Sequence, residues 1–135
     1  LRAIPNLIVI RPADANETVE AWKFAINHKG GPVALILTRQ KVDVIDQNKY
    51  ASPAGLNRGA YILKDSKQNP DLLLIATGSE VSLSIKAAEK LEAEGKNVRV
   101  ISFPSWEIFE QQDEEYKKRI FPKDIKAKVV KMPFV

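Results

Sequence analysis

Residues 7–37 read LIVIRPADANETVEAWKFAINHKGGPVALIL, in which two short apolar runs flank a more polar segment. Leu7–Ile10 and Val33–Leu37 are unbroken apolar runs, a pattern typical of strands buried on both faces of a parallel sheet. Between them, Asp14 and Glu17 have the three-residue spacing of a capping box, which marks the start of a helix. The stretch therefore predicts a strand, a helix and a second strand joined as a βαβ unit.

The helix predicted inside this unit has an apolar side. Its apolar residues recur at helical spacing: Val19, Trp22, Ala25 and Ile26. We expect this side to pack on the sheet, with Trp22 as a packing anchor. Lys29 suits the negative end of the helix, and the Gly30–Pro32 segment ends it.

The pattern weakens between Lys41 and Asn69. This span is rich in Asp, Asn, Ser, Gly and Pro, and it is interrupted by one brief apolar stretch, Ala60–Leu63. A long, weakly structured span is unusual inside one compact domain. We therefore interpret residues 46–69 as a linker between two domains.

The alternation of strands and helices returns after Pro70. The predicted elements are a strand at Leu72–Ala76, a helix whose apolar face is Val81, Ile85, Ala88 and Leu91, a strand at Val98–Ile101, one or two short helices within Trp106–Arg119 and a strand at Ala127–Val130. A second capping box, Thr77 with Glu80, is expected at the start of the first of these helices. The fold class is α/β, with parts of two doubly wound, mostly parallel-sheet domains.

Composition excludes several classes of protein and site. The 135 residues contain no cysteine, so disulfide scaffolds, thiolate zinc sites and cysteine nucleophiles are excluded. The single histidine, His28, excludes a histidine-rich metal cluster. No apolar run approaches the roughly 20 residues of a membrane helix. No secretory signal is recognisable at the start, Leu1–Asn6, so we expect a cytoplasmic protein without membrane contact.

The basic excess is small and scattered. The formal net charge is +4, and the late lysines are mixed with acidic residues. A nucleic-acid surface would concentrate basic side chains on one face with aromatic residues between them. A solvated surface explains the pattern better, so no nucleic-acid partner is expected.

Most candidate catalytic residues have a simpler structural explanation. Asp14 and Glu17 could be paired acid–base carboxylates, but their spacing suits helix capping. His28 suits the negative end of the first helix. The turn Thr77–Glu80 joins a strand to a helix and could hold an anion, although Glu80 would repel a phosphate. These residues are not assigned a catalytic role.

Arg39 is the strongest candidate for ligand binding. It follows the carboxyl end of the predicted Val33–Leu37 strand, and open α/β sheets bind ligands outside the carboxyl ends of their strands. A guanidinium there can bind phosphate or carboxylate through two parallel hydrogen bonds. From position alone, a ligand contact and a surface salt bridge both remain open.

The chain resembles the transketolase family in several segments that occur in order. Resemblance to the end of the family's pyrimidine-binding domain rests on Leu1–Asn6, Ile10–Glu17 and Leu37–Gln40. Resemblance to the start of its C-terminal domain rests on Pro70–Asp71, Ile75–Val81, Val98–Ser102 and Pro104–Trp106. Related thiamine-dependent families share the layout, but the Arg39–Gln40 pair fits them less well.

This resemblance implies a function and a site. It implies transfer of a two-carbon ketol unit between sugar phosphates, and it assigns Arg39 to binding of the substrate phosphate. It also implies thiamine diphosphate and Mg²⁺ as cofactors, a homodimer and a place in the pentose phosphate pathway. The family's catalytic glutamate and its cofactor ligands have no counterpart here, so no catalytic, cofactor-binding or metal-binding residue is assigned.

The resemblance also divides the chain and leaves alternatives. It implies that residues 1–45 end a pyrimidine-binding domain and that 70–135 begin a C-terminal domain, incomplete and with an atypical tail at 131–135. Lys41–Asp43 departs from the family's Leu-Pro continuation, so the following loop is expected to differ. Two other interpretations stay open: a catalytically inactive structural or interaction fragment, and a relative of dihydroxyacetone synthase.

Overall fold

The predicted βαβ unit forms as expected. The computed structural model describes residues 4–125 and 127–131. Strand β1 (Ile8–Ile10) and strand β2 (Val33–Leu35) pair in parallel, and helix α1 (Ala15–Asn27) connects them. β1 is buried, whereas β2 is half-buried. Both strands are shorter than the apolar runs that predict them.

The capping box at the start of α1 is confirmed. Asp14 is the N-cap residue, and its Oδ1 accepts a hydrogen bond of 2.9 Å from the Glu17 N–H. The Glu17 carboxylate in turn accepts a 2.8 Å bond from the Ala13 N–H. The helix ends one residue before His28, which is its C-cap. Lys29 therefore lies beyond the last turn.

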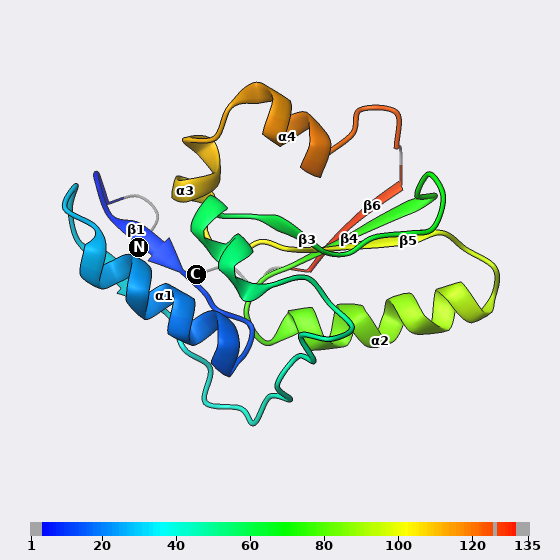
Figure 1. The fold of residues 1–135 in the computed structure, drawn as a ribbon, viewed down its shortest axis with the longest axis horizontal. Coiled ribbons are helices and arrows are strands. Elements are labelled where there is room, and N and C mark those ends of the chain that lie inside the picture. Colours follow the sequence, from blue (N-terminus) through cyan, green and yellow to red (C-terminus); the bar gives the residue numbers. More distant parts are fainter. Residues whose placement is uncertain (1–3, 126, 132–135) are drawn as a thin grey trace.

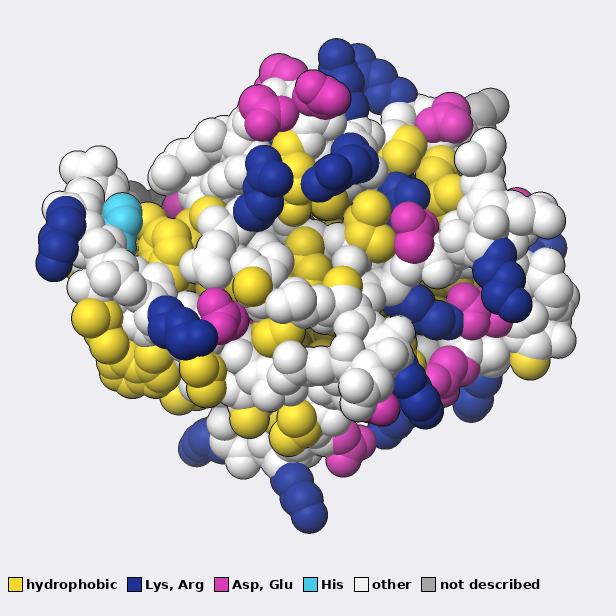
Figure 2. Space-filling model, in the orientation of Figure 1, with side chains coloured by type: hydrophobic (Ala, Val, Ile, Leu, Met, Phe, Trp, Pro, Cys, Tyr) yellow, Lys and Arg dark blue, Asp and Glu magenta, His cyan; other side chains and the backbone are white. Residues whose placement is uncertain are grey.

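The predicted packing face of α1 is wrong. Val19, Trp22 and Ile26 are 54%, 54% and 69% exposed. The side of α1 that faces inward carries Ala21 and Glu17, which are both buried. Figure 2 shows hydrophobic side chains gathered on the surface over α1, at the left of the view. Periodicity identified an apolar side of the helix but not the side that the neighbouring elements cover.

Part of the span interpreted as a linker has regular structure. A 3₁₀ helix, η1 (Pro53–Arg58), is capped by the Ser52 hydroxyl, which accepts a bond from the Ala54 N–H. It leads through Gly59 into strand β3 (Tyr61–Lys64). β3 pairs antiparallel with residues 100–102, which belong to a second, four-stranded sheet. The apolar stretch within residues 46–69 is therefore a strand at the edge of that sheet.

The second sheet has four strands in the order β3-β5-β4-β6. β4 (Leu72–Ala76) pairs in parallel with β5 (Val98–Ser102) on one side and with β6 (Ala127–Lys131) on the other. The predicted strands after Pro70 are therefore confirmed. The predicted short helices are α3 (Trp106–Glu110) and α4 (Glu114–Ile120).

Helices cover both faces of this sheet (Figure 1). Helix α2 (Glu80–Ala93) packs on one face through Val81, Ile85 and Ala88. On the other face, α3 and α4 contribute their buried aromatic and aliphatic side chains. The alternation of side chains along β4 and β5 supplies both cores, which explains their unbroken apolar sequences. The α/β fold class, with parallel-dominated sheets, is confirmed.

The βαβ unit packs directly against the rest of the described chain, here called the second unit, which comprises η1, the four-stranded sheet and helices α2–α4. Leu56 of η1 and Ile108 of α3 complete the core beneath β1 and α1. The free edge of β1 is also engaged, since the Val9 N–H donates to the Glu107 carboxylate of α3 at 3.2 Å. Gly59 adopts a φ of +81°, and a Cβ there would lie 2.2 Å from the Phe109 nitrogen. Close approach of η1 to α3 therefore requires glycine at this position.

Within residues 4–125 and 127–131, no helix is long and apolar enough to cross a bilayer. The tail predicted to be atypical begins at Lys131, the last residue of β6. The rest of that prediction concerns residues 132–135, which lie outside the described part of the chain.

Candidate substrate site at the end of strand β2

Arg39 lies past the carboxyl end of β2, as the sequence predicts. The Ile36 N–H still bonds the Ile10 carbonyl at 2.9 Å, so the chain leaves the sheet beside the end of β1. A tight turn follows, in which the Thr38 hydroxyl accepts a 3.1 Å bond from the Gln40 N–H. Arg39 is exposed in this turn and has no hydrogen bond or ion pair to any residue that the structure describes. Within residues 4–125 and 127–131, Arg39 does not form the surface salt bridge that position alone left open.

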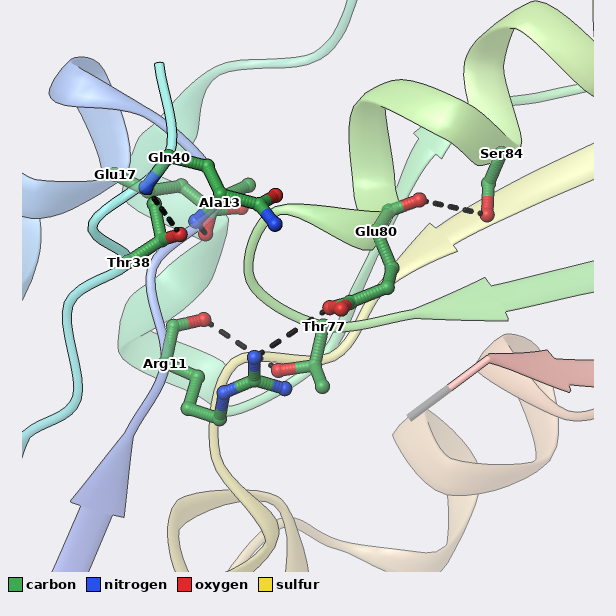
Figure 3. Close-up of polar contacts among 8 residues, drawn as sticks. All are labelled: Arg11, Ala13, Glu17, Thr38, Gln40, Thr77, Glu80 and Ser84. Carbon is green, nitrogen blue, oxygen red and sulfur yellow. Dashed lines mark hydrogen bonds and ion pairs between the residues drawn. The ribbon is translucent and has the colours of Figure 1, made fainter. Parts of the chain in front are cut away.

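The carboxyl ends of strands from both sheets converge around Arg11. The Arg11 main chain, which follows β1, donates to the Pro104 carbonyl beyond β5 at 2.9 Å. Its carbonyl accepts a 3.2 Å bond from the Gly78 N–H beyond β4. Figure 3 shows Arg11 between the end of β1 and the loop that follows β4. Because open α/β sheets bind ligands outside the carboxyl ends of their strands, a ligand site is expected at this edge.

The Arg11 side chain takes part in the architecture of this junction. The residue is 9% exposed, and its Nη2 lies 3.5 Å from Glu80 Oε2 (Figure 3). Its Nη1 is buried without a hydrogen-bond partner among the described residues. A Cβ on Gly78 would lie only 3.0 Å from this guanidinium. Arg11 is therefore enclosed by the protein, whereas Arg39 is exposed.

The second capping box, predicted from Thr77 and Glu80, is wrong. Ser79 is the N-cap of α2, and it makes no side-chain capping bond. The Thr77 hydroxyl bonds the Arg11 carbonyl instead, and the Glu80 carboxylate pairs with the Arg11 guanidinium. Both side chains serve the contact between the two units. A carboxylate at the start of α2 also disfavours a bound anion there.

The sequence does not reveal that Glu17 lies in a buried polar cluster joining the two units. Its Oε1 accepts bonds from the Tyr61 hydroxyl at 2.8 Å and from the Ser102 hydroxyl at 2.6 Å. Burial is the main cause that raises the pKa of Glu17, and the nearby Asp14 charge adds to it. Burial also raises the pKa of Tyr61, with the Glu17 charge as the next cause. The capping box explains only the bond from the Ala13 N–H to the Glu17 carboxylate, so the local pattern could not have found the bonds from Tyr61 and Ser102.

Asp14 and Asn16 hold the far end of the loop that carries Arg39. The second carboxylate oxygen of Asp14 accepts a 2.8 Å bond from the Ile45 N–H. The Asn16 side-chain amide donates to the Ile45 carbonyl at 3.2 Å. The sequence predicts helix capping for Asp14 and gives no binding or positioning role to Asn16.

The remaining candidates lie away from Arg39 or serve packing. His28 stacks on Phe24 with the ring centroids 5.3 Å apart. Trp106 is 41% exposed and packs on Phe103 with the ring centroids 4.6 Å apart, so it contributes to packing. Trp22 does not act as a packing anchor, because it projects outward from α1 and is 54% exposed.

Two family models match this chain. Residues 1–44 match the transketolase pyrimidine-binding domain, and residues 59–133, more than half of the chain, match the transketolase-like C-terminal domain. The chain belongs to the transketolase family. Two relatives, the transketolases of Aquifex aeolicus and Staphylococcus aureus, are 51% and 49% identical to it over 129 residues. Those residues are 96% of this chain but only 19% and 20% of the relatives, so this transketolase-family chain spans about a fifth of their length.

Solved transketolases have the same fold over this region. Transketolase from Leishmania mexicana superimposes with a TM-score of 0.85 at 37% identity, covering 96% of this chain and 19% of that one. A Pichia stipitis transketolase in complex with sedoheptulose-7-phosphate gives 0.80 at 40% identity, covering 90% and 17%. A split-gene transketolase, described as an inactive β4 tetramer, gives 0.72 at 29% identity, covering 96% and 40%.

The residues that the structure describes do not fit the cofactors that the transketolase family implies. No group of three or more His, Asp or Glu residues within the described ranges could hold a metal ion, so ligands for Mg²⁺ are not found there. The start of α2 is no cradle for a diphosphate either, because Glu80 places its carboxylate beside it. No step of the reaction is therefore derived through thiamine diphosphate from these residues.

Proposed function

We propose that this chain is part of a transketolase, which transfers a two-carbon ketol unit from a ketose phosphate to an aldose phosphate. Within it, Arg39 binds the phosphate of the sugar substrate. The observation that carries the proposal is an exposed arginine, without a partner among the described residues, at the carboxyl edge of β2. Membership of the transketolase family supports the reaction class.

The role of Arg39 in this reaction is binding and orientation. Its guanidinium stays charged and presents a planar fork of donors that matches phosphate oxygens. Holding the phosphate end fixes how far the sugar extends towards the reacting carbons. Thiamine diphosphate with Mg²⁺ supplies the covalent chemistry in the proposed whole enzyme. Residues elsewhere in that enzyme would hold the cofactor.

An Arg39→Ala variant of the complete transketolase tests this role. Loss of a hydrogen-bonded charge pair should weaken the use of phosphorylated substrates by about 1.5–3 kcal/mol. The measurement is kcat/KM for a sugar phosphate and for its non-phosphorylated analogue. The analogue should be far less affected, since it has no phosphate for Arg39 to bind.

Two further variants sharpen this experiment. Arg39→Lys keeps the charge but not the bidentate fork, so its kcat/KM for the sugar phosphate should lie between those of the wild type and Arg39→Ala. Lys29→Ala removes an exposed positive charge before the amino end of β2 and is the matched control, expected to act as wild type. Equal losses for phosphorylated and non-phosphorylated substrates in Arg39→Ala would contradict the proposal.

A second candidate is that the 135-residue polypeptide alone is an inactive structural or interaction fragment. The absence of a metal-holding cluster from residues 4–125 and 127–131 favours it. The similar split-gene transketolase, described as inactive, supports the idea that such a portion can exist without activity. Calorimetric titration of the chain with thiamine diphosphate and Mg²⁺ should give no binding heat. Clear binding would show that cofactor ligands are present in this chain after all.

The proposed domain organisation follows the same reasoning. Residues 1–45 would end a pyrimidine-binding domain and residues 70–135 would begin a C-terminal domain. The first family match, to residues 1–44, supports the proposed end of the pyrimidine-binding domain. The second match covers residues 59–133, so it begins before residue 70 and leaves residues 45–58 between the two matches. The whole enzyme is proposed to be a homodimer, which sedimentation equilibrium of the complete protein would test.

A further inference from the structure

Residues 36–45, here called the Arg39 loop, contain no helix or strand. They carry Arg39, the proposed phosphate-binding residue. A side chain on such a loop loses conformational freedom when it binds, and this loss weakens binding unless the loop is already fixed. One end is fixed where the Ile36 N–H bonds the Ile10 carbonyl. The position of Arg39 therefore depends on how the other end is held.

Ile45 is held through both of its backbone groups. Its N–H donates to Asp14 Oδ2 at 2.8 Å, and its carbonyl accepts from Asn16 Nδ2 at 3.2 Å. The Ile45 side chain also packs against the core beneath α2. Two side chains at the start of α1 thus bond this residue much as a neighbouring strand would.

The Asp14 carboxylate couples this attachment to the helix itself. Its Oδ1 accepts the capping bond from the Glu17 N–H at 2.9 Å, while its Oδ2 holds Ile45. Asp14 is 4% exposed, so solvent competes little for either bond. The start of α1 and the end of the Arg39 loop are therefore fixed by one buried group.

An ion pair of the loop is a weaker attachment. Asp43 forms an ion pair with Lys86 of α2 at 3.5 Å, but the two side chains are 76% and 64% exposed. Exposed ion pairs of this kind contribute little to stability. The bonds from Asp14 and Asn16, here called the Ile45 clasp, are the stronger attachment.

We propose that Asp14 and Asn16 are positioning residues for substrate phosphate binding, because the Ile45 clasp holds the Arg39 loop in the conformation that binds. The inference rests on the proposed role of Arg39. Asn16 is the better residue to test, because its side chain bonds Ile45 and makes no capping bond at the start of α1. Asp14→Asn is a second variant, since asparagine still caps helices well but presents one oxygen fewer.

The first experiment measures kinetics of the complete transketolase carrying Asn16→Ala. Loss of one neutral hydrogen bond should raise KM for a phosphorylated substrate about 2- to 10-fold, while kcat stays unchanged. KM for a non-phosphorylated analogue should not change. The matched control is Asn27→Ala, which removes a side-chain bond to the Lys23 carbonyl at the other end of α1. Equal increases in KM for both substrates would indicate a merely structural role and overturn the inference.

The second experiment tests the clasp without enzyme activity. Arg39 and Lys41 are exposed sites for trypsin within the loop. In the 135-residue chain, Asn16→Ala should speed cleavage at these two sites but not at Lys67 or Lys96, which lie in other exposed turns. Asn27→Ala should cleave as wild type. Unchanged cleavage at Arg39 and Lys41 in Asn16→Ala would overturn the clasp.

The two proposals can fail separately. If Arg39→Ala loses phosphate discrimination while Asn16→Ala keeps wild-type KM and cleavage, the positioning role is wrong and the function of Arg39 stands. If Asn16→Ala speeds loop cleavage while Arg39→Ala does not discriminate phosphorylated substrates, the proposed function fails. The positioning role then fails with it.

Discussion

Glu17 is the residue whose environment departs most from its local sequence. Three hydrogen bonds hold its buried carboxyl, and no lysine or arginine among the described residues pairs with it. Burial raises its pKa above the ordinary value of 4.5. The folded chain therefore binds this proton more tightly than the unfolded chain does. The resulting stabilisation is complete below the unfolded pKa and is lost as pH rises through the folded one.

A Glu17→Gln variant should show this linkage. Glutamine can accept the Ala13 N–H bond and donate to the Tyr61 and Ser102 hydroxyls, so the cluster stays satisfied without a titrating group. From pH 5 to pH 8, the wild type should lose free energy of unfolding relative to the variant. Urea denaturation at each pH provides the measurement.

Glu20→Gln is the control for this series, since Glu20 lies on the same helix and the hydrogen bond from Lys23 lowers its pKa. Its stabilisation is lost only as pH falls below the ordinary value, so its difference from wild type should be flat between pH 5 and 8. A flat difference for Glu17→Gln as well would show that the buried carboxyl does not hold its proton more tightly.

Helix α1 has the predicted apolar periodicity, but its larger apolar side chains face outward. Its apolar residues recur with the correct period, but the side facing β1 and η1 is narrow and carries the small residue Ala21. A small side chain allows close approach of the helix to Leu56. The larger apolar side chains are left on the outside of the described structure.

Side-chain size alone would predict a large loss of stability on changing Trp22 and a small one on changing Ala21. The burial of the two residues predicts the reverse. Trp22→Ala removes a large but half-exposed side chain and should change the free energy of unfolding by less than about 1 kcal/mol. Ala21→Leu inserts volume at a position that is 0% exposed and should cost about 1–3 kcal/mol. Urea denaturation of both variants of the 135-residue chain checks the pair. A larger loss for Trp22→Ala than for Ala21→Leu would reverse the assignment of the two faces.

At the scale of the whole molecule, Arg11 links the two units. Its main chain bonds the segments that follow β4 and β5, and its side chain pairs with Glu80 of α2. The Glu17 cluster and the Val9–Glu107 bond add polar contacts across the same junction. We expect the units to unfold together, because each covers part of the core of the other.

Glu80→Gln tests the junction. The variant leaves a largely buried guanidinium without its carboxylate, which should cost about 1–3 kcal/mol in free energy of unfolding. This range is below that for fully buried pairs because the Glu80 side chain is 20% exposed. Glu94→Gln, at the exposed end of α2, is the control and should stay within about 0.5 kcal/mol of wild type. Equal effects of the two substitutions would mean that the Arg11–Glu80 pair contributes nothing to the junction.

Local patterns in the sequence were enough for the order and type of most elements. Unbroken apolar runs predict β1 and β4, the Asp14–Glu17 spacing predicts the start of α1, and the residues around Arg39 carry the family resemblance. These features depend on neighbours within a few positions, which is the range over which periodicity and capping act. The placement of Arg39 at a strand end follows from the same local reasoning.

Contacts between distant segments decided the rest. Tyr61 and Ser102 lie far along the chain from Glu17, and Glu80 lies far from Arg11. The burial of a carboxylate, the exposed side of α1 and the Ile45 clasp depend on which surfaces meet after the chain folds. No local spacing of residues encodes these contacts between distant segments, because burial is a property of the assembled core.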